Sequence, residues 1–144
     1  MGGYGTLIYA LKYPQFFAAA APFSAGIFTS DELKAMPDNN YANVLARVFG
    51  SNLKADARLT NQWYANSVLD IVAKESTDSL KRVRYWIDCG DDDFLTNANC
   101  LLHIALTNKQ CRMNSVCGMV RTTGYWRTGI TDALQFIRDS FHQK

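Results

Sequence analysis

Short apolar runs and helical apolar stripes alternate along the chain. One apolar run extends from Phe16 to Phe23 and ends at Ser24-Ala25-Gly26, and a second short segment with an apolar centre extends from Arg84 to Cys89. Their lengths and flanking turn residues predict strands that are buried on both faces, as in parallel sheets. The segments around them carry apolar residues at helical spacing. This alternation predicts an α/β fold in which parallel strands alternate with helices.

The helix boundaries follow from the same pattern. The first helix begins behind Met1 and is closed by Pro14, which also restricts the residue before it. Further helices are predicted over residues 41–49, 61–74, 97–108 and 130–141, and residues 29–40 are predicted to form a loop. Residues 111–124 have neither helical nor strand periodicity, although a strand and a loop are expected there.

Composition favours a single globular domain over residues 1–144. Hydrophobic residues make up 48% of the chain and charged residues 19%, which is typical of globular and not of disordered proteins. The formal net charge is +2, and no apolar run reaches the ~20 residues that span a membrane. Neither nucleic acid nor membrane is an expected partner. No signal peptide follows Met1, and the compartment of the parent protein, cytoplasmic or secreted, stays open.

A metal site is not expected. The four cysteines form no Cys-x-x-Cys pair, and only His103 and His142 could complete a site. These spacings do not match those of zinc sites. Cys89 at a strand end and Cys100 on a helix are expected to be buried thiols of the core.

The chain begins Met1-Gly2-Gly3-Tyr4-Gly5. Such a segment usually follows the serine of a Gly-x-Ser-x-Gly turn, where a strand ends and a helix begins directly behind the nucleophile. The glycines allow the sharp turn, and the neighbouring N–H groups then face the substrate oxygen. A flexible start to a helix is the alternative explanation. A phosphate-binding loop is not expected, because no Lys-Ser/Thr pair follows the glycines.

Four segments together resemble the C-terminal half of the esterase D-like "putative esterase" family of α/β-hydrolases. In the family's order they are Met1–Gly5, Tyr13–Phe17, Cys89–Leu95 and Tyr125–Gly129. The family includes feruloyl, acetyl-xylan and short-chain carboxylesterases and S-formylglutathione hydrolases. The resemblance implies a partial α/β-hydrolase fold, truncated just after the nucleophile serine and without the N-terminal half of its sheet. It also implies a serine carboxylic-ester hydrolase that acts on a small-molecule ester and uses no cofactor.

The resemblance assigns one catalytic residue, Asp93. In this family the triad acid is the last residue of a Gly-x-x-Asp turn after a strand, and the turn Gly90–Asp93 matches it. Its role would be to hold the catalytic histidine in the correct tautomer and to stabilise the imidazolium. A solvated acidic turn is the alternative. Met1, Gly2 and Gly3 would be the remnant of the oxyanion elbow.

Aromatic residues suggest a substrate cleft. Phe94 follows the acidic turn, Trp126 precedes the last helix, and Trp63 and Tyr64 lie on a predicted helix. They could line a cleft that holds a sugar or a phenolic group. The alternative, which we favour from the sequence, is that these aromatics form the core and the cap over the sheet.

The family's catalytic histidine is absent from its expected place before Tyr125. The expected turn resembles Asp-Gly-x-His-x-Trp. One coding of the family-like peptide His-Glu-Phe-Arg-Val-Arg-Asp-Gly-Ala-His-Asn-Trp-Thr, read one base out of frame, translates to residues 113–124 of this chain. We therefore interpret residues 112–124 as frame-shifted. Because Gly118 and Asn114 are poor strand formers, the sheet edge here is expected to be short or absent.

Two functions are open from the sequence. The first is a carboxylic-ester hydrolase by descent that is inactive as given, because the triad residues act as a unit. The second is a non-catalytic pseudoenzyme or a fragment that binds a carbohydrate or phenolic group. Ser24 and Ser67 are not expected to replace the nucleophile, since neither lies in a Gly-x-Ser-x-Gly turn. Exposed apolar surface on the first helix and the strands predicts self-association.

Overall fold

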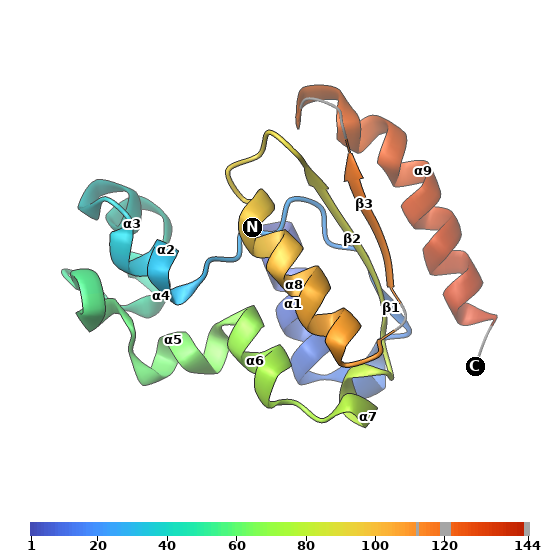
Figure 1. Cartoon of the computed structure of the whole chain (residues 1–144), viewed down its shortest axis with the longest axis horizontal. Helices are drawn as coiled ribbons and strands as arrows, with labels where there is room; N and C mark the ends of the chain where they lie inside the picture. The colour runs from blue at the N-terminus through green and yellow to red at the C-terminus, as the bar shows by residue number, and fades with distance from the viewer. Residues whose placement is uncertain (112, 119–121, 143–144) are drawn as a thin grey trace.

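A computed structural model describes residues 1–111, 113–118 and 122–142, with the backbone alone over 114–118 and 122–128. Figure 1 shows its elements, in which η marks a 3₁₀ helix. In chain order they are α1 (Gly2–Lys12), η1 (Pro14–Phe16), β1 (Ala19–Ala20), α2 (Ser30–Ala35), α3 (Asp38–Val44), α4 (Ala46–Phe49), η2 (Ala55–Arg58), α5 (Asn61–Asn66), α6 (Val68–Lys74), α7 (Thr77–Leu80), β2 (Arg84–Gly90), α8 (Thr96–Asn108), β3 (Met113–Gly118) and α9 (Thr122–Phe141).

The strands form a three-stranded sheet in the order β1-β2-β3, and both strand pairs are parallel. Helices α1, α6 and α8 cover one face of this sheet and α9 covers the other (Figure 1). The prediction of an α/β fold with parallel strands is therefore confirmed. Among the described residues, no helix is both long and apolar enough to cross a membrane.

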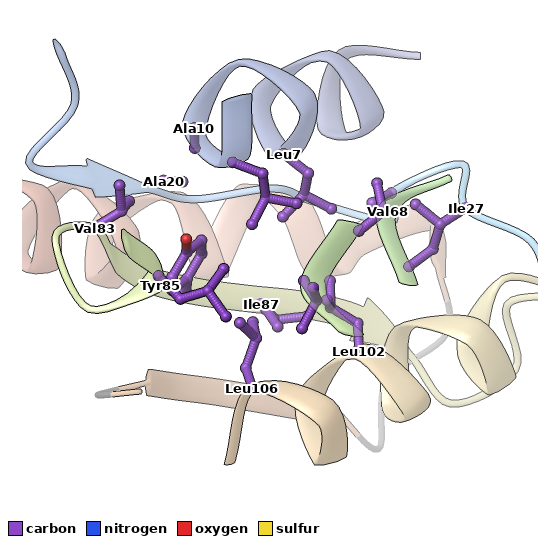
Figure 2. Close-up of a cluster of buried hydrophobic side chains, with 14 of the residues drawn as sticks. Leu7, Ala10, Ala20, Ile27, Val68, Val83, Tyr85, Ile87, Leu102 and Leu106 are labelled. Atoms are coloured by element: carbon purple, nitrogen blue, oxygen red, sulfur yellow. The ribbon is translucent and has the colours of Figure 1, made fainter. Parts of the chain in front are cut away.

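The central strand β2 supplies side chains to both faces of the sheet. Tyr85 and Ile87 point into the main core, where they meet side chains of α1, α6 and α8, including Leu7 and Leu102 (Figure 2). Trp86 points to the opposite face and packs in a smaller cluster with residues of α9. Successive side chains of a strand point to opposite faces, so an apolar run without alternation is what a strand covered on both sides requires.

Residues 28–64 form a cap with a core of its own. Its buried members are Leu33, Tyr41, Leu45, Phe49 and Trp63. The loop predicted over residues 29–40 is wrong, because α2 and the start of α3 lie there. Helix α2 begins with a capping box, in which the Thr29 side chain accepts from the Glu32 N–H and the Glu32 side chain accepts from the Thr29 N–H. This Thr-x-x-Glu signature was present in the sequence.

Two predicted boundaries and one predicted burial need correction. The strand predicted over residues 16–23 shrinks to Ala19–Ala20 with one isolated bridge from Phe23 to Asp88, because the chain leaves η1 only at Phe16 and Pro22 has no N–H to donate. The helix predicted over 61–74 breaks at Ser67, whose hydroxyl caps α6. Cys100 is exposed, although Cys89 is buried as expected.

The expectation of a short or absent sheet edge after residue 111 is also wrong. Strand β3 pairs with β2 in parallel over six residues, from Tyr85↔Met113 to Gly90↔Gly118. Strand propensity depends strongly on context, and a buried neighbouring strand provides a complete row of backbone partners. That row outweighs the poor propensities of Asn114 and Gly118.

Helix α1 lies against the end of β1 at Gly3. A Cβ atom at Gly3 would lie 2.7 Å from the Phe23 carbonyl oxygen and 3.0 Å from the Ala25 Cα, whereas nothing lies within 4 Å of one at Gly5. We therefore expect Gly3→Ala to lower the free energy of unfolding by roughly 1–3 kcal/mol through backbone displacement. Gly5→Ala should raise it by up to ~1 kcal/mol through helix propensity. Urea unfolding of both variants checks this, and equal effects would contradict the close approach.

Candidate active site

The turns that follow β1 and β2 open onto one cavity at the carboxyl ends of these strands. Ser24 follows β1, and Phe94 and Leu95 follow β2. The cavity has a volume of about 200 Å³ and its walls are mostly apolar. Ligands of open parallel sheets bind at this end of the strands. The cavity is therefore the candidate site of the described part of the chain.

The cap forms the opposite wall of the cavity. Helices α4 and α5 contribute Val48, Phe49 and Trp63, and the segment before α2 contributes Phe28. The Trp63 indole is held edge-on by Phe49, with ring centroids 5.1 Å apart and an interplanar angle of 70°. Trp63 thus belongs both to the core of the cap and to the cavity wall. The two alternatives predicted for the aromatic residues, a core position and a cleft position, both apply to it.

Asp93 lies in a turn directly after β2, as the resemblance to the family's Gly-x-x-Asp turn implies. Its backbone N–H donates to the Gly90 carbonyl (3.3 Å), and its carboxylate Oδ1 accepts from the Leu95 N–H (3.0 Å). The Thr96 hydroxyl donates to the Asp93 carbonyl (2.7 Å) at the start of α8. The side chain is half-buried and fixed by its own turn. Part of segment 119–124, where the family's histidine turn is expected, lies outside the described residues.

Asn99 joins the two turns, and sequence reasoning did not identify it. This side chain on α8 is 2% exposed. Its Nδ2 donates to the Ala25 carbonyl (3.0 Å) after β1 and to the Leu95 carbonyl (2.9 Å) after β2. One amide therefore holds the end of β1 against the turn of Asp93. A single asparagine inside a helical stripe has no pattern that predicts such a role.

Of the other predicted site residues that the structure describes, Met1 and Phe94 alone are seen to line the cavity. They are 78% and 84% exposed. Gly2 and Gly3 form the first turn of α1. Tyr64 does not line the cavity and lies beneath the Lys74 ammonium, 5.6 Å from the ring centroid. The side chain of Trp126 lies outside the described residues.

The two serines considered as replacement nucleophiles differ in their surroundings. Ser67 is buried, and its hydroxyl caps α6 by accepting from the Asp70 N–H (3.4 Å). Ser24 has a positive φ of 39°, which is rare outside glycine, and its N–H donates to the Asp88 carbonyl (2.8 Å). Its hydroxyl is buried and finds no hydrogen-bond partner among the described residues. Neither geometry provides an activating base.

Polar groups at the cavity are few. The Tyr4 hydroxyl donates to the Asn66 carbonyl (2.9 Å), and burial raises the pKa of Tyr4 above its usual value. Within the described ranges, no three His, Cys, Asp or Glu side chains come together as a metal site would require. His103 is half-buried on α8 and His142 is exposed after α9. The cavity suits an apolar ligand. Asp93 is not among the residues that line it, although the next two residues, Phe94 and Leu95, are.

Comparison with solved structures supports the same fold. A ferulic acid esterase matches with 26% identity and a TM-score of 0.67, over 98% of this chain and 49% of its own. The S-formylglutathione hydrolase of Staphylococcus aureus matches with 20% identity and a TM-score of 0.59, over 95% of this chain and 51% of its own. The chain thus spans about half the length of these structures and forms a fragment of their α/β-hydrolase fold.

Sequence comparison gives the family. No protein of curated function matches significantly. The family model described as "Putative esterase" matches residues 1–128, a range that includes the glycine segment, the turn of Asp93 and the segment around Tyr125. The chain therefore belongs to the putative esterase family of α/β-hydrolases.

Proposed function

We propose that this chain is part of a serine carboxylic-ester hydrolase in which Asp93 occupies the position of the triad acid. The observation that carries the proposal is the position of Asp93, in a half-buried turn at the carboxyl end of β2, directly before Phe94 and Leu95, which line the apolar cavity. Membership of an esterase family gives the reaction class. In the complete enzyme, a serine would attack the ester carbonyl, and a histidine oriented by Asp93 would take the serine proton and pass it to the leaving alcohol.

The sequence of this chain does not contain the complete catalytic triad. The sequence has no Gly-x-Ser-x-Gly motif and no histidine between His103 and His142. Serine and histidine act as a unit with the acid, so their loss removes nearly all of the triad's contribution. We therefore propose that the chain as given hydrolyses esters no faster than buffer does.

The test is hydrolysis of p-nitrophenyl acetate by the chain and by three variants, Ser24→Ala, Ser67→Ala and Asp93→Asn. All four proteins should give the rate of buffer alone. Turnover that disappears in Ser24→Ala or Ser67→Ala alone would assign a new nucleophile. Turnover that survives all three changes would show that the chemistry lies elsewhere. Either result would contradict the proposal of inactivity.

We further propose that residues 112–124 result from a frame shift. The support is the match between residues 113–124 and an out-of-frame reading of a family-like peptide that contains the missing histidine. The nucleotide sequence of the source locus tests this. An uninterrupted reading frame that encodes residues 112–124 as given, found on independent sequencing and preceded by its own promoter and ribosome site, would favour a separate small protein instead.

A second candidate function is the binding of a phenolic compound. Aromatic rings of Phe28, Phe49, Trp63 and Phe94 line the cavity, and apolar cavities with rigid aromatic walls suit flat aromatic ligands. Ferulate should quench the fluorescence of Trp63 in a saturable way. Val48→Phe, which fills the cavity, should weaken this binding roughly tenfold. Ile104→Phe, on an exposed position of α8 outside the cavity, is the matched control. Equal binding by both variants would contradict the cavity as the site.

A further inference from the structure

The Asn99 side chain binds the backbone of two segments that are far apart in the sequence. It lies on the buried stripe of α8, three residues before Leu102. Its Nδ2 donates to the carbonyls of Ala25 (3.0 Å) and Leu95 (2.9 Å), while its Oδ1 is buried and finds no hydrogen-bond partner among the described residues. The opposite orientation of the amide would place an oxygen against both carbonyls. The two bonds therefore require the donor side of the amide.

The bond to Leu95 connects Asn99 with the turn of Asp93. The Leu95 N–H donates to the Asp93 carboxylate Oδ1 (3.0 Å). Asn99 thus holds, by its carbonyl, the residue whose N–H orients this carboxylate. Other bonds of the turn join residues within 90–96, such as the bond from the Asp93 N–H to the Gly90 carbonyl (3.3 Å). Such local bonds fix the shape of the turn but not its place in the molecule.

The bond to Ala25 ties this turn to a well-held segment. Ala25 is fully buried. The residue before it, Ser24, donates its N–H to the Asp88 carbonyl of β2 (2.8 Å). On another side, Gly3 of α1 packs so closely that a Cβ atom there would lie 3.0 Å from the Ala25 Cα. The Ala25 carbonyl is therefore held in place by β2 and by the first turn of α1.

The two parts that Asn99 joins are those whose separation matters for ester hydrolysis. In the proposed function, Asp93 is the triad acid, and the first turn of α1, which includes Gly3, belongs to the elbow of the nucleophile. A histidine can bond to both only within a narrow range of separations, and a displacement of about 1 Å can lower the rate ~10²-fold. On the basis of that function, we propose that Asn99 is a positioning residue, which holds the turn of Asp93 at the separation from the elbow that the reaction requires.

The surroundings of Asn99 suit this role. Helix α8 is anchored in the main core by Leu102 and Leu106, which are fully buried, and side chains on such anchored helices hold a site more precisely than those on loops. Phe94 and Leu95 line the cavity, but Asn99 is not among the residues that line it. Loss of the amide should therefore affect the rate of the chemical step more than the binding of the substrate.

Hydrogen exchange of the full chain measures how firmly the turn is held. Asn99→Ala should speed exchange of the Leu95 amide at least roughly tenfold relative to the Leu102 amide, which reports the stability of α8 itself. Asn99→Ser should do the same. Its hydroxyl can bond to the Leu95 carbonyl within the helix, but the side chain is one bond shorter than asparagine and leaves Ala25 unbound.

Asn97→Ala is the matched control. Asn97 lies in the same turn of α8 and is exposed, and its Nδ2 donates to the Glu32 carboxylate of the cap (2.8 Å). It binds neither of the two segments that Asn99 joins. The control should therefore change exchange of the Leu95 amide less than about twofold.

The effect on the reaction is measured in a protein with a complete triad. In it, the chain is joined to the half of the ferulic acid esterase that it does not match, and residues 112–124 are replaced by the family-like peptide with its histidine. Asn99→Ala should lower kcat for methyl ferulate roughly 10–100-fold and change KM less than about twofold, whereas Asn97→Ala should keep both. In the Asp93→Asn background, Asn99→Ala should change kcat less than about twofold, because a residue that acts through Asp93 has no further effect once that carboxylate is lost.

Two results would overturn the positioning role. One is exchange of the Leu95 amide that neither Asn99 variant changes. The other is a fall in kcat that is as large in the Asp93→Asn background as without that change, since a merely structural role predicts equal effects. Failure of the proposed function would look different. Asp93→Asn would then leave kcat unchanged, whether or not the Asn99 variants loosen the turn.

Discussion

Replacing Arg58 by methionine should lower the free energy of unfolding by roughly 2–4 kcal/mol. Arg58 is 1% exposed at the centre of the cap. Its Nε donates to the Leu53 carbonyl (3.0 Å), and its Nη1 donates to the carbonyls of Leu33 (3.0 Å) and Met36 (2.5 Å). Methionine keeps the aliphatic volume and leaves these three carbonyls without their donor. The substitution also removes the cost of burying the Arg58 charge. The expected loss of unfolding free energy is therefore smaller than the summed desolvation cost of three unpaired carbonyls.

The Arg58 guanidinium also contacts the side chains of Asp38 and Tyr41 in the cap. It donates to the Asp38 carboxylate (2.5 Å) and lies 4.4 Å from the centroid of the Tyr41 ring. Lys54→Met is the matched control, because the Lys54 ammonium pairs with the same carboxylate (3.3 Å) from a side chain that is 76% exposed. Exposed pairs contribute little, so this variant should change stability by less than ~0.5 kcal/mol. Urea unfolding that gives equal losses for both variants would contradict the buried role of Arg58.

Loss of the cap should also affect the cavity. Arg58 ties the C-terminal end of α2 to the start of α3, and α4 and α5 of the same cap contribute Val48, Phe49 and Trp63 to the cavity wall. A cap that is disordered by Arg58→Met should therefore lose ferulate binding together with Trp63 packing, whereas Lys54→Met should retain both.

Features that depend on neighbouring residues in the sequence could be predicted. The run from Arg84 to Cys89 gave β2, and the Gly-x-x-Asp spacing behind it gave the position of Asp93. A short apolar run bounded by turn residues has few alternatives to a buried strand. The first helix and its end before Pro14 followed from equally local restrictions.

Features that depend on contacts between distant segments could not be predicted from the sequence. The amide of Asn99 binds carbonyls of Ala25 and Leu95, and only the folded sheet brings these two turns together. Strand β3 forms although its residues favour other structures, because β2 supplies its backbone partners. The missed helix α2 is a different case, since its Thr29–Glu32 capping box was visible in the sequence.

The proposed role of Asp93 is tested most directly in a protein with a complete triad. The chain would be joined to the half of the ferulic acid esterase that it does not match, which is to supply the nucleophile serine. Residues 112–124 would be replaced by the family-like peptide that contains a histidine. We expect this protein to hydrolyse p-nitrophenyl acetate and methyl ferulate. Changing its serine to alanine should abolish turnover, and Asp93→Asn should lower kcat by about 10³–10⁴-fold, because the histidine loses the group that fixes its tautomer.

Asp92→Asn, one residue earlier on an exposed position of the same turn, is the matched control and should keep most of the activity. We expect the folded, complete protein to hydrolyse both esters, and we expect this activity to be lost with Asp93→Asn and retained with Asp92→Asn. A restored protein that unfolds cooperatively but hydrolyses neither ester, or one whose kcat is the same in both aspartate variants, would contradict the role of Asp93 as the triad acid.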